Sequence, residues 1–231
     1  MSADDLKALG QHFLLRHLPE PELSRILGMA ARKHYADKQT IFSRGDPGSG
    51  MMAVLSGRVR IVNYSADGKE VVLRVVTAGE VIGEITLIDG GDRTADAVAM
   101  GPTELLFLSR RDFLPFLEDH PRIGIELLKV LCARLRGTSE QLEDFTFLAL
   151  RPRLAKVLLR LIDEHGKAVD GGIHIDLPLS QNLLAAMMGT SREAVNKQLR
   201  EWEETGIVAL ARNSITITDQ PALEALLEDE L

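Results

Sequence analysis

Residues 79–95 contain side chains of the types that bind phosphate. The segment Ile82-Gly83-Glu84-Ile85 is followed, nine residues after Glu84, by Arg93-Thr94-Ala95. Gly83 would let a ligand approach the backbone, and N–H groups at the start of a short helix would attract an anion. Arg93 offers a charged fork to phosphate oxygens, Thr94 a hydroxyl donor, and Glu84 an acceptor for a sugar hydroxyl. The pattern predicts a phosphate site, with a plain loop carrying a surface arginine as the alternative.

Side chains that can read DNA bases gather between residues 180 and 206. On a helical wheel, one arc of about 140° holds Arg192, Glu193, Asn196, Lys197 and Arg200. Arg192 can donate two hydrogen bonds to guanine O6 and N7, and Glu193 can accept one from cytosine N4. Lys197 can reach a base or a phosphate. The alternative is a solvated helix face with ion pairs.

The elements that would position this arc have the layout of a helix-turn-helix. We expect helices near residues 153–165, 180–188 and 192–205, with a short strand at Ile215-Thr216-Ile217. The helix over 180–188 runs into Gly189, and Thr190 or Ser191 would cap the next one. An apolar stripe next to the arc lets the last helix pack on its domain; it consists of Val195, Leu199 and Trp202. This context favours DNA binding.

The phosphate-binding segment lies in a stretch that predicts β-structure. From Thr40 to Ser109, short β-branched runs alternate with turns, and glycines recur at Gly45, Gly57, Gly68, Gly79 and Gly83. Glycine at such spacing marks turns that need a positive φ, and Ala66-Asp67-Gly68-Lys69 is the clearest hairpin signal. We expect an antiparallel barrel or roll.

A long amphipathic helix is expected from about Pro121 to Leu148. Its seam has regular three- and four-residue steps through Leu128, Leu131, Leu135, Thr138, Leu142, Phe145 and Ala149. A seam of this kind usually pairs with its own copy in a homodimer, although packing on its own domain is the alternative. Thr138 is the polar member, either setting the register or contacting a ligand. Pro152 is expected to end or bend the helix, which places a domain boundary near residues 149–152.

Composition limits the class of protein. The chain has 231 residues, 45% hydrophobic and 26% charged, which fits a globular protein of two domains or one large one. No apolar run is long enough for a transmembrane helix, and the acidic start does not match a signal peptide. Cys132 is the only cysteine, which excludes a disulfide framework and thiolate-rich metal sites and fits a reducing cytoplasm.

The net charge of −7 argues against nucleic-acid binding. Residues 151–231 hold 9 Lys and Arg against 13 Asp and Glu. We therefore expect weak, salt-sensitive nonspecific affinity for DNA, with specific affinity arising from two copies that bind together.

Four features together resemble the Crp–Fnr family of bacterial transcription regulators, and its cAMP-receptor branch in particular. They are the glycine-spaced strands, Gly83-Glu84 with Arg93-Thr94-Ala95, the seam helix with Thr138-Ser139, and Ser191-Arg192-Glu193. The resemblance covers nearly the whole chain. It implies an α+β fold, with an antiparallel β-roll (a cyclic-nucleotide-binding jelly-roll) and long dimerisation helix in residues 1–149. Residues 150–231 would form a winged helix-turn-helix.

The resemblance also implies roles for individual residues. The nucleotide-binding set is Gly83, Glu84, Ile85, Arg93, Thr94, Ala95, Arg134, Thr138 and Ser139, in which Gly83 and Glu84 face the ribose and Arg93 and Thr94 bind the cyclic phosphate. Thr138 would contact the purine in its own subunit, and Ser139 would reach the partner subunit's nucleotide. The DNA-binding set is Ser180, Gln181, Ser191, Arg192, Glu193, Asn196 and Lys197. Dimerisation would involve Leu128, Leu131, Leu135, Leu142 and Phe145.

The implied function is a cAMP-dependent homodimeric regulator that binds a palindrome near TGTGA–N6–TCACA and contacts RNA polymerase. Thr94 occurs where serine is common, which adds cGMP as a second ligand to test. Lys197 replaces an arginine, so it lacks a bidentate fork at that base pair. There are two alternatives. One is a family member that senses another effector, and the other is a nucleotide-binding module without DNA binding.

Other sensor chemistries and catalysis are not expected. A single cysteine cannot hold an iron–sulfur cluster, and Cys132 is expected to be a small buried hydrophobe. The histidines show no metal spacing, so neither haem nor a metal is expected; they are His12, His17, His34, His120, His165 and His174. No nucleophile–base set or carboxylate pair indicates an enzyme.

Overall fold

The computed structural model describes residues 18–227, and His12 and His17 lie outside this range. The chain divides into two compact units. The first combines residues up to Ser65 with Leu73–Leu135, and the second combines Ala66–Val72 with the residues from Arg136 onward. Within the described range, no helix is both long and apolar enough to cross a membrane.

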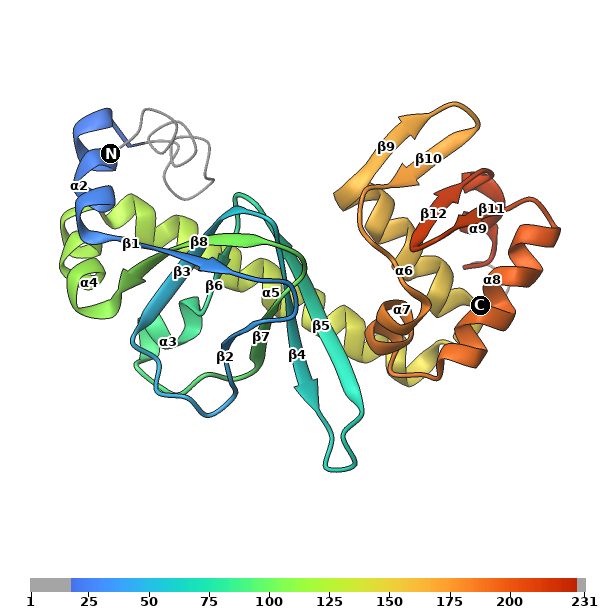
Figure 1. The fold of residues 1–231 in the computed structure, drawn as a ribbon, viewed down its shortest axis with the longest axis horizontal. Helices are drawn as coiled ribbons and strands as arrows, with labels where there is room; N and C mark the ends of the chain where they lie inside the picture. Colours follow the sequence, from blue (N-terminus) through green and yellow to red (C-terminus); the bar gives the residue numbers. More distant parts are fainter. Residues whose placement is uncertain (1–17, 228–231) are drawn as a thin grey trace. The chain divides into compact units, whose positions relative to one another are not determined.

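The first unit contains the predicted antiparallel β-roll (Figure 1). One sheet has the order β1-β8-β3-β6 and the other the order β2-β7-β4-β5. The strands are β1 (Ala31–Tyr35), β2 (Thr40–Phe42), β3 (Gly50–Ser56), β4 (Arg58–Tyr64), β5 (Glu70–Thr77), β6 (Val81–Ile82), β7 (Asp96–Ala99) and β8 (Thr103–Ser109). The five glycines predicted at turns all have positive φ, at Gly45, Gly57, Gly68, Gly79 and Gly83.

Strands β3 and β8 are apolar on both faces because each face packs on a different layer. Met52 and Val54 of β3 belong to a core cluster that also holds Val59 of β4 and Ala97 of β7. Met51 and Ala53, which alternate with them, belong to a second cluster with residues of the helices. The two-residue period of a strand therefore explains the continuous apolar run over residues 50–55.

The helices of the first unit cover the second cluster. They are α2 (Glu20–Met29), α3 (Glu84–Asp89), α4 (Arg110–Asp119) and the start of α5 (Pro121–Phe147). Ile26, Phe113 and Leu127 are buried there. The roll thus holds the N-terminal part of α5 through one face of that helix.

The seam of α5 is confirmed as an exposed apolar row in the isolated chain. Leu128, Leu135 and Leu142, seven residues apart, are 59%, 69% and 67% exposed. Two corrections concern this helix. Ala149 is not a seam residue, because α5 ends at Phe147 and Ala149 is the N-cap of the next helix. Cys132 is exposed rather than buried, because it lies on the solvent side of α5.

The second unit contains three predicted helices and more β-structure than expected. Its elements are α6 (Leu150–His165), β9 (Gly166–Val169), β10 (Gly172–Ile175), α7 (Gln181–Met188), α8 (Arg192–Glu204), β11 (Val208–Ala211), β12 (Ser214–Ile217) and α9 (Gln220–Ala225). Four strands form one sheet in the order β11-β12-β10-β9. Residues 166–172, for which the sequence analysis expected no strand, belong to the hairpin β9–β10. Pro152 lies in the first turn of α6, where its missing N–H costs nothing.

Candidate functional site

Arg93 is the centre of the predicted phosphate site, and it is almost fully buried, at 5% exposure. Its Nη1 donates to Gly83 O at 3.1 Å and to Thr86 Oγ1 at 2.6 Å, and its Nη2 donates to Gly50 O at 2.7 Å. These bonds use three of the five N–H groups of a guanidinium. Two N–H groups remain for an anionic ligand.

The backbone around Arg93 is shaped to admit its guanidinium. Gly83 has a left-handed φ of 75°, and a Cβ there would lie 2.1 Å from Arg93 Nη1. Gly48 is similarly close to Thr86, with 2.2 Å between a Cβ and Thr86 Cβ. The ring of Phe42 lies 4.3 Å from the guanidinium carbon, a cation–π contact. Gly83 was expected to make room for a ligand, whereas the group that occupies this space is Arg93.

The charge of Arg93 is maintained inside the roll. Burial lowers the pKa of the guanidinium, and the carboxylates of Glu84 and Asp46 act in the opposite direction. Arginine stays protonated through shifts of this kind. A buried, oriented positive charge is well suited to an anion.

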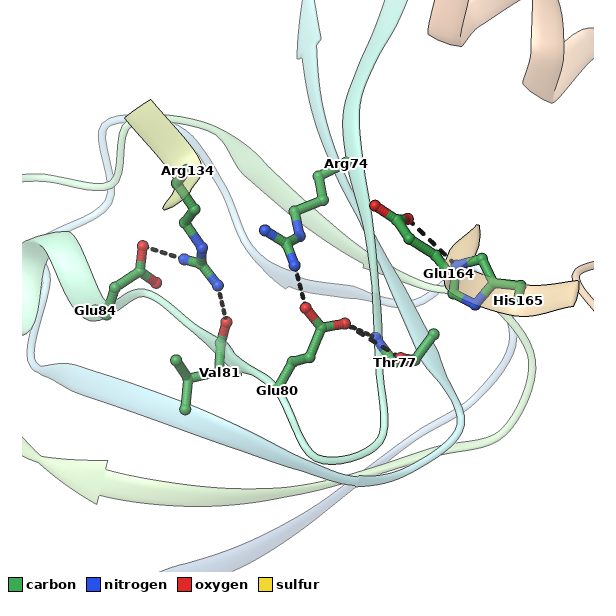
Figure 2. Close-up of polar contacts among 8 residues, drawn as sticks. All are labelled: Arg74, Thr77, Glu80, Val81, Glu84, Arg134, Glu164 and His165. Carbon is green, nitrogen blue, oxygen red and sulfur yellow. Dashed lines mark hydrogen bonds and ion pairs between the residues drawn. The ribbon is translucent and has the colours of Figure 1, made fainter. Parts of the chain in front are cut away.

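Glu84 is joined to α5 by an ion pair that the sequence did not indicate. Its carboxylate, 2% exposed, pairs with Arg134. Arg134 Nη2 also donates to Val81 O at 2.5 Å, so one side chain of α5 holds both ends of the segment before α3 (Figure 2). On the adjacent turn, Glu80 pairs with Arg74 and accepts from Thr77 N at 2.7 Å. Arg134 therefore fixes residues 81–84 of the predicted phosphate site against α5.

The other predicted nucleotide-binding residues lie around this cluster. Thr94 and Ile85 are exposed, and Ala95 is buried next to Arg93. Thr138 and Ser139 are exposed on α5, four and five positions after Arg134. The structure brings together Gly83, Glu84, Arg93 and Arg134 by direct contacts.

The predicted helix-turn-helix is present in α7 and α8. Ser180 Oγ accepts from Leu183 N at 3.1 Å, and Ser191 Oγ accepts from Ala194 N at 3.2 Å, so both serines are N-caps. Gly189 ends α7 with a φ of 58°, and its missing Cβ would be 3.3 Å from the ring of Phe145. Ser180 and Ser191 thus have a structural role at the two helix starts.

The base-reading arc of α8 is accessible. Val195, Leu199 and Trp202 are buried, as the apolar stripe predicted. On the neighbouring arc Arg192, Glu193 and Lys197 are exposed, and Asn196 is half-buried. Gln181 of α7 contacts this arc, since its Nε2 donates to Asn196 Oδ1 at 2.7 Å. Spacing on α8 alone did not reveal this contact between helices.

The described His, Cys, Asp and Glu side chains do not form a ligand set for a metal ion. Within residues 18–227, no group of three or more His, Cys, Asp or Glu could hold a metal ion. Among the described histidines, His34 is exposed and His120 is the C-cap of α4, as expected, whereas His165 and His174 are half-buried.

Comparison with known proteins identifies the family. The cyclic nucleotide-binding domain model matches residues 32–120, and the Crp-like helix-turn-helix domain model matches residues 152–226. The "Cyclic AMP receptor protein" of Thermus thermophilus is 33% identical over 92% of this chain and 95% of its own length. The chain belongs to the CRP/FNR family, called Crp–Fnr above. It is a transcription regulator with a cyclic nucleotide-binding domain and a DNA-binding helix-turn-helix.

Further CRP/FNR relatives agree in sequence and fold. The "CRP-like cAMP-activated global transcriptional regulator" of Mycobacterium tuberculosis is 33% identical over 80% of this chain and 82% of its own length. The structure of the c-di-GMP responsive regulator CLP of Xanthomonas campestris is 25% identical, with a TM-score of 0.76 over 87% of this chain and all of CLP. The family consists of transcription regulators and not of enzymes.

Proposed function

We propose that this regulator is a homodimer whose binding to palindromic DNA depends on cAMP. The observation that carries the proposal is the buried Arg93, which keeps two N–H groups for an anion within a cyclic nucleotide-binding domain. A cyclic phosphate has two exocyclic oxygens, which a guanidinium can bind as a fork. The relatives from Thermus thermophilus and Mycobacterium tuberculosis carry cAMP in their names.

The nucleotide site is proposed to extend from the roll to α5. Arg93 and Thr94 would bind the phosphate, with Gly83, Glu84, Ile85 and Ala95 around it. Arg134, already paired with Glu84, would join the pocket to α5, on which Thr138 and Ser139 would contact the base. The Thr94 hydroxyl supports cGMP as a second ligand, through a contact to guanine.

The dimer is proposed to form through α5. Leu128, Leu135 and Leu142 would lose a large exposed apolar area on pairing with a second copy, and each fully buried leucine contributes roughly 1.5–3 kcal/mol. Leu131 and Phe145 are the further members of this interface. We also propose that the functional domains are residues 1–149 and 150–231, divided at the break between α5 and α6.

The DNA site is proposed to be a palindrome near TGTGA–N6–TCACA, read by Arg192, Glu193, Asn196 and Lys197 of each α8. Ser180, Gln181 and Ser191 would support this surface. RNA polymerase is the proposed protein partner. Two copies of α8 are needed because the second unit carries excess negative charge, which lowers the affinity of one copy.

Calorimetric titration with cAMP and cGMP, each followed by a DNA shift assay, tests the effector and its coupling to DNA. Cyclic di-GMP is the control ligand, since the relative CLP is described as responsive to it. We expect cAMP to bind and to strengthen the shift of the palindromic probe. A response to cyclic di-GMP alone would contradict the assignment of cAMP.

The pocket is proposed to sense the nucleotide without hydrolysing it, because its contacts provide charge and hydrogen bonds but no activated nucleophile. Incubation of the protein with cAMP should leave the nucleotide intact. Formation of AMP, above that in a sample of the Arg93→Ala variant, would contradict this proposal.

A further inference from the structure

A short series of side chains joins the start of α7 to the base-reading arc of α8. Arg192 Nε donates to Gln181 Oε1 at 3.4 Å, and Gln181 Nε2 donates to Asn196 Oδ1 at 2.7 Å. Arg192 and Asn196 are four positions apart on α8, so they are neighbours on one face. Gln181 therefore bridges two residues of the surface that faces DNA.

The direction of each hydrogen bond in this series is fixed by chemistry. Arginine has donors only, so Gln181 must turn its amide oxygen toward Arg192. The amide nitrogen of Gln181 then points to Asn196, which can accept only through Oδ1. The remaining group of the half-buried Asn196 amide is Nδ2, a donor.

We propose that Gln181 is a positioning residue that sets the base preference of Asn196. An unrestrained asparagine reads adenine with both groups of its amide, one donating to N7 and one accepting from N6. With Oδ1 turned toward Gln181, the amide of Asn196 presents its donor Nδ2 to the major groove. In the major groove, guanine O6 and thymine O4 accept hydrogen bonds, whereas adenine N6 and cytosine N4 donate them. Purine N7 atoms accept as well, so cytosine is the one base that offers Nδ2 no acceptor in the major groove. Asn196 thus disfavours cytosine on the strand that it contacts.

The same bridge affects Arg192. Its Nε is taken by Gln181, so the two terminal nitrogens are left to meet guanine O6 and N7. Gln181, which belongs to α7, consequently orients both the charged side chain of Arg192 and the neutral side chain of Asn196 toward the bases. This inference rests on DNA binding through α8.

The test is the Gln181→Glu variant, which keeps the acceptor for Arg192 but removes the donor to Asn196. Asn196 then turns its amide, gives Nδ2 to the new carboxylate and presents Oδ1 to DNA. Competition binding measures the affinities of palindromic probes that carry each of the four bases at every half-site position. At one position, the affinity for cytosine rises relative to guanine and thymine by about two- to tenfold, the worth of one hydrogen bond. Adenine, which carries both an acceptor and a donor, changes least.

Two further variants separate this effect from added charge and from loss of folding. In an Asn196→Ala background, Gln181→Glu lowers the affinity for all probes alike and leaves the base preference unchanged. Asn196→Asp keeps the bond from Gln181 and presents only acceptors, so it produces the same rise of cytosine relative to guanine and thymine. Thermal unfolding of each variant verifies that the second unit is folded.

Three results would overturn the proposal. The first is an unchanged base preference in both Gln181→Glu and Asn196→Asp. The second is a change of base preference on Gln181→Glu that persists in the Asn196→Ala background. The third is an equal loss of affinity for all probes in Asn196→Ala, which is typical of a phosphate contact. Absence of any probe shift by the wild-type protein would instead contradict DNA binding itself.

Discussion

At the scale of single residues, the sequence pointed to Arg93 as a candidate phosphate ligand but did not indicate the residues that hold its guanidinium. Arg93 could be singled out because of its residue type and its spacing from Gly83 in the sequence. Thr86 and Gly50 could not be found in this way, because Gly50 is 43 positions from Arg93 and contributes only a backbone carbonyl. The Arg134–Glu84 pair joins two elements, and no local pattern predicts which charges will meet.

Gly83→Ala is expected to impair nucleotide binding. A side chain there meets Arg93 Nη1 and requires an unfavourable left-handed backbone, which costs about 1–2 kcal/mol of stability. Gly79→Ala is the matched control, because Gly79 also has a positive φ, of 92°, but nothing lies within 4 Å of its added Cβ. Calorimetry should show weaker cAMP binding only for Gly83→Ala, whereas thermal unfolding should show lower stability for both. Equal cAMP affinities would contradict the geometry.

Thr86→Val is expected to weaken cAMP binding by roughly 0.5–1.5 kcal/mol, because it removes one hydrogen bond that orients Arg93. Valine preserves the shape of the side chain, and Thr86→Ser preserves the hydroxyl. Titration calorimetry should therefore find similar cAMP affinities for the wild type and Thr86→Ser, and a lower cAMP affinity for Thr86→Val. The opposite order would show that the methyl group matters and the hydroxyl does not.

At the scale of elements, long periodic segments were predictable and short strands were not. The seam helix and both helices of the helix-turn-helix match within two residues, because heptad spacing and serine caps are local signals. Strands β9 to β11 were missed, since each has four residues, and β9 is exposed along its whole length. Their position depends on sheet partners that are distant in sequence.

Leu135→Glu is expected to dissociate the dimer, because it places an unpaired charge in the proposed interface, at a cost of several kcal/mol. The control is Arg136→Gln, an exposed position next to the seam that makes the same change in net charge. Analytical ultracentrifugation should find a dissociation constant about a hundredfold higher, or more, for Leu135→Glu alone. A monomeric wild type, or dimers in both variants, would exclude α5 as the interface.

Arg192→Ala is expected to reduce discrimination at one guanine by about 1–3 kcal/mol, because it removes the proposed contact of the Arg192 terminal nitrogens with that base. Binding assays on probes with each base at that position measure the loss. A similar loss on every probe would instead identify Arg192 as a phosphate contact.

At the scale of the whole molecule, charge and regulation are connected. A net charge of −7 disfavours DNA binding by a single copy, which is why we propose that specific binding uses two α8 helices at once. Arg134 contacts Glu84 and Val81 and belongs to the same helix as the seam. A nucleotide that binds at Arg93, as we propose, would therefore act on the helix that is proposed to pair two copies.

The most direct test of nucleotide-gated DNA binding is the affinity for a labelled palindromic probe, measured by fluorescence anisotropy with and without saturating cAMP. The wild-type protein should bind at least about tenfold more tightly with cAMP, a coupling of about 1.4 kcal/mol. Arg93→Ala should show no such gain. Equal affinities of the wild type with and without bound cAMP would contradict the account.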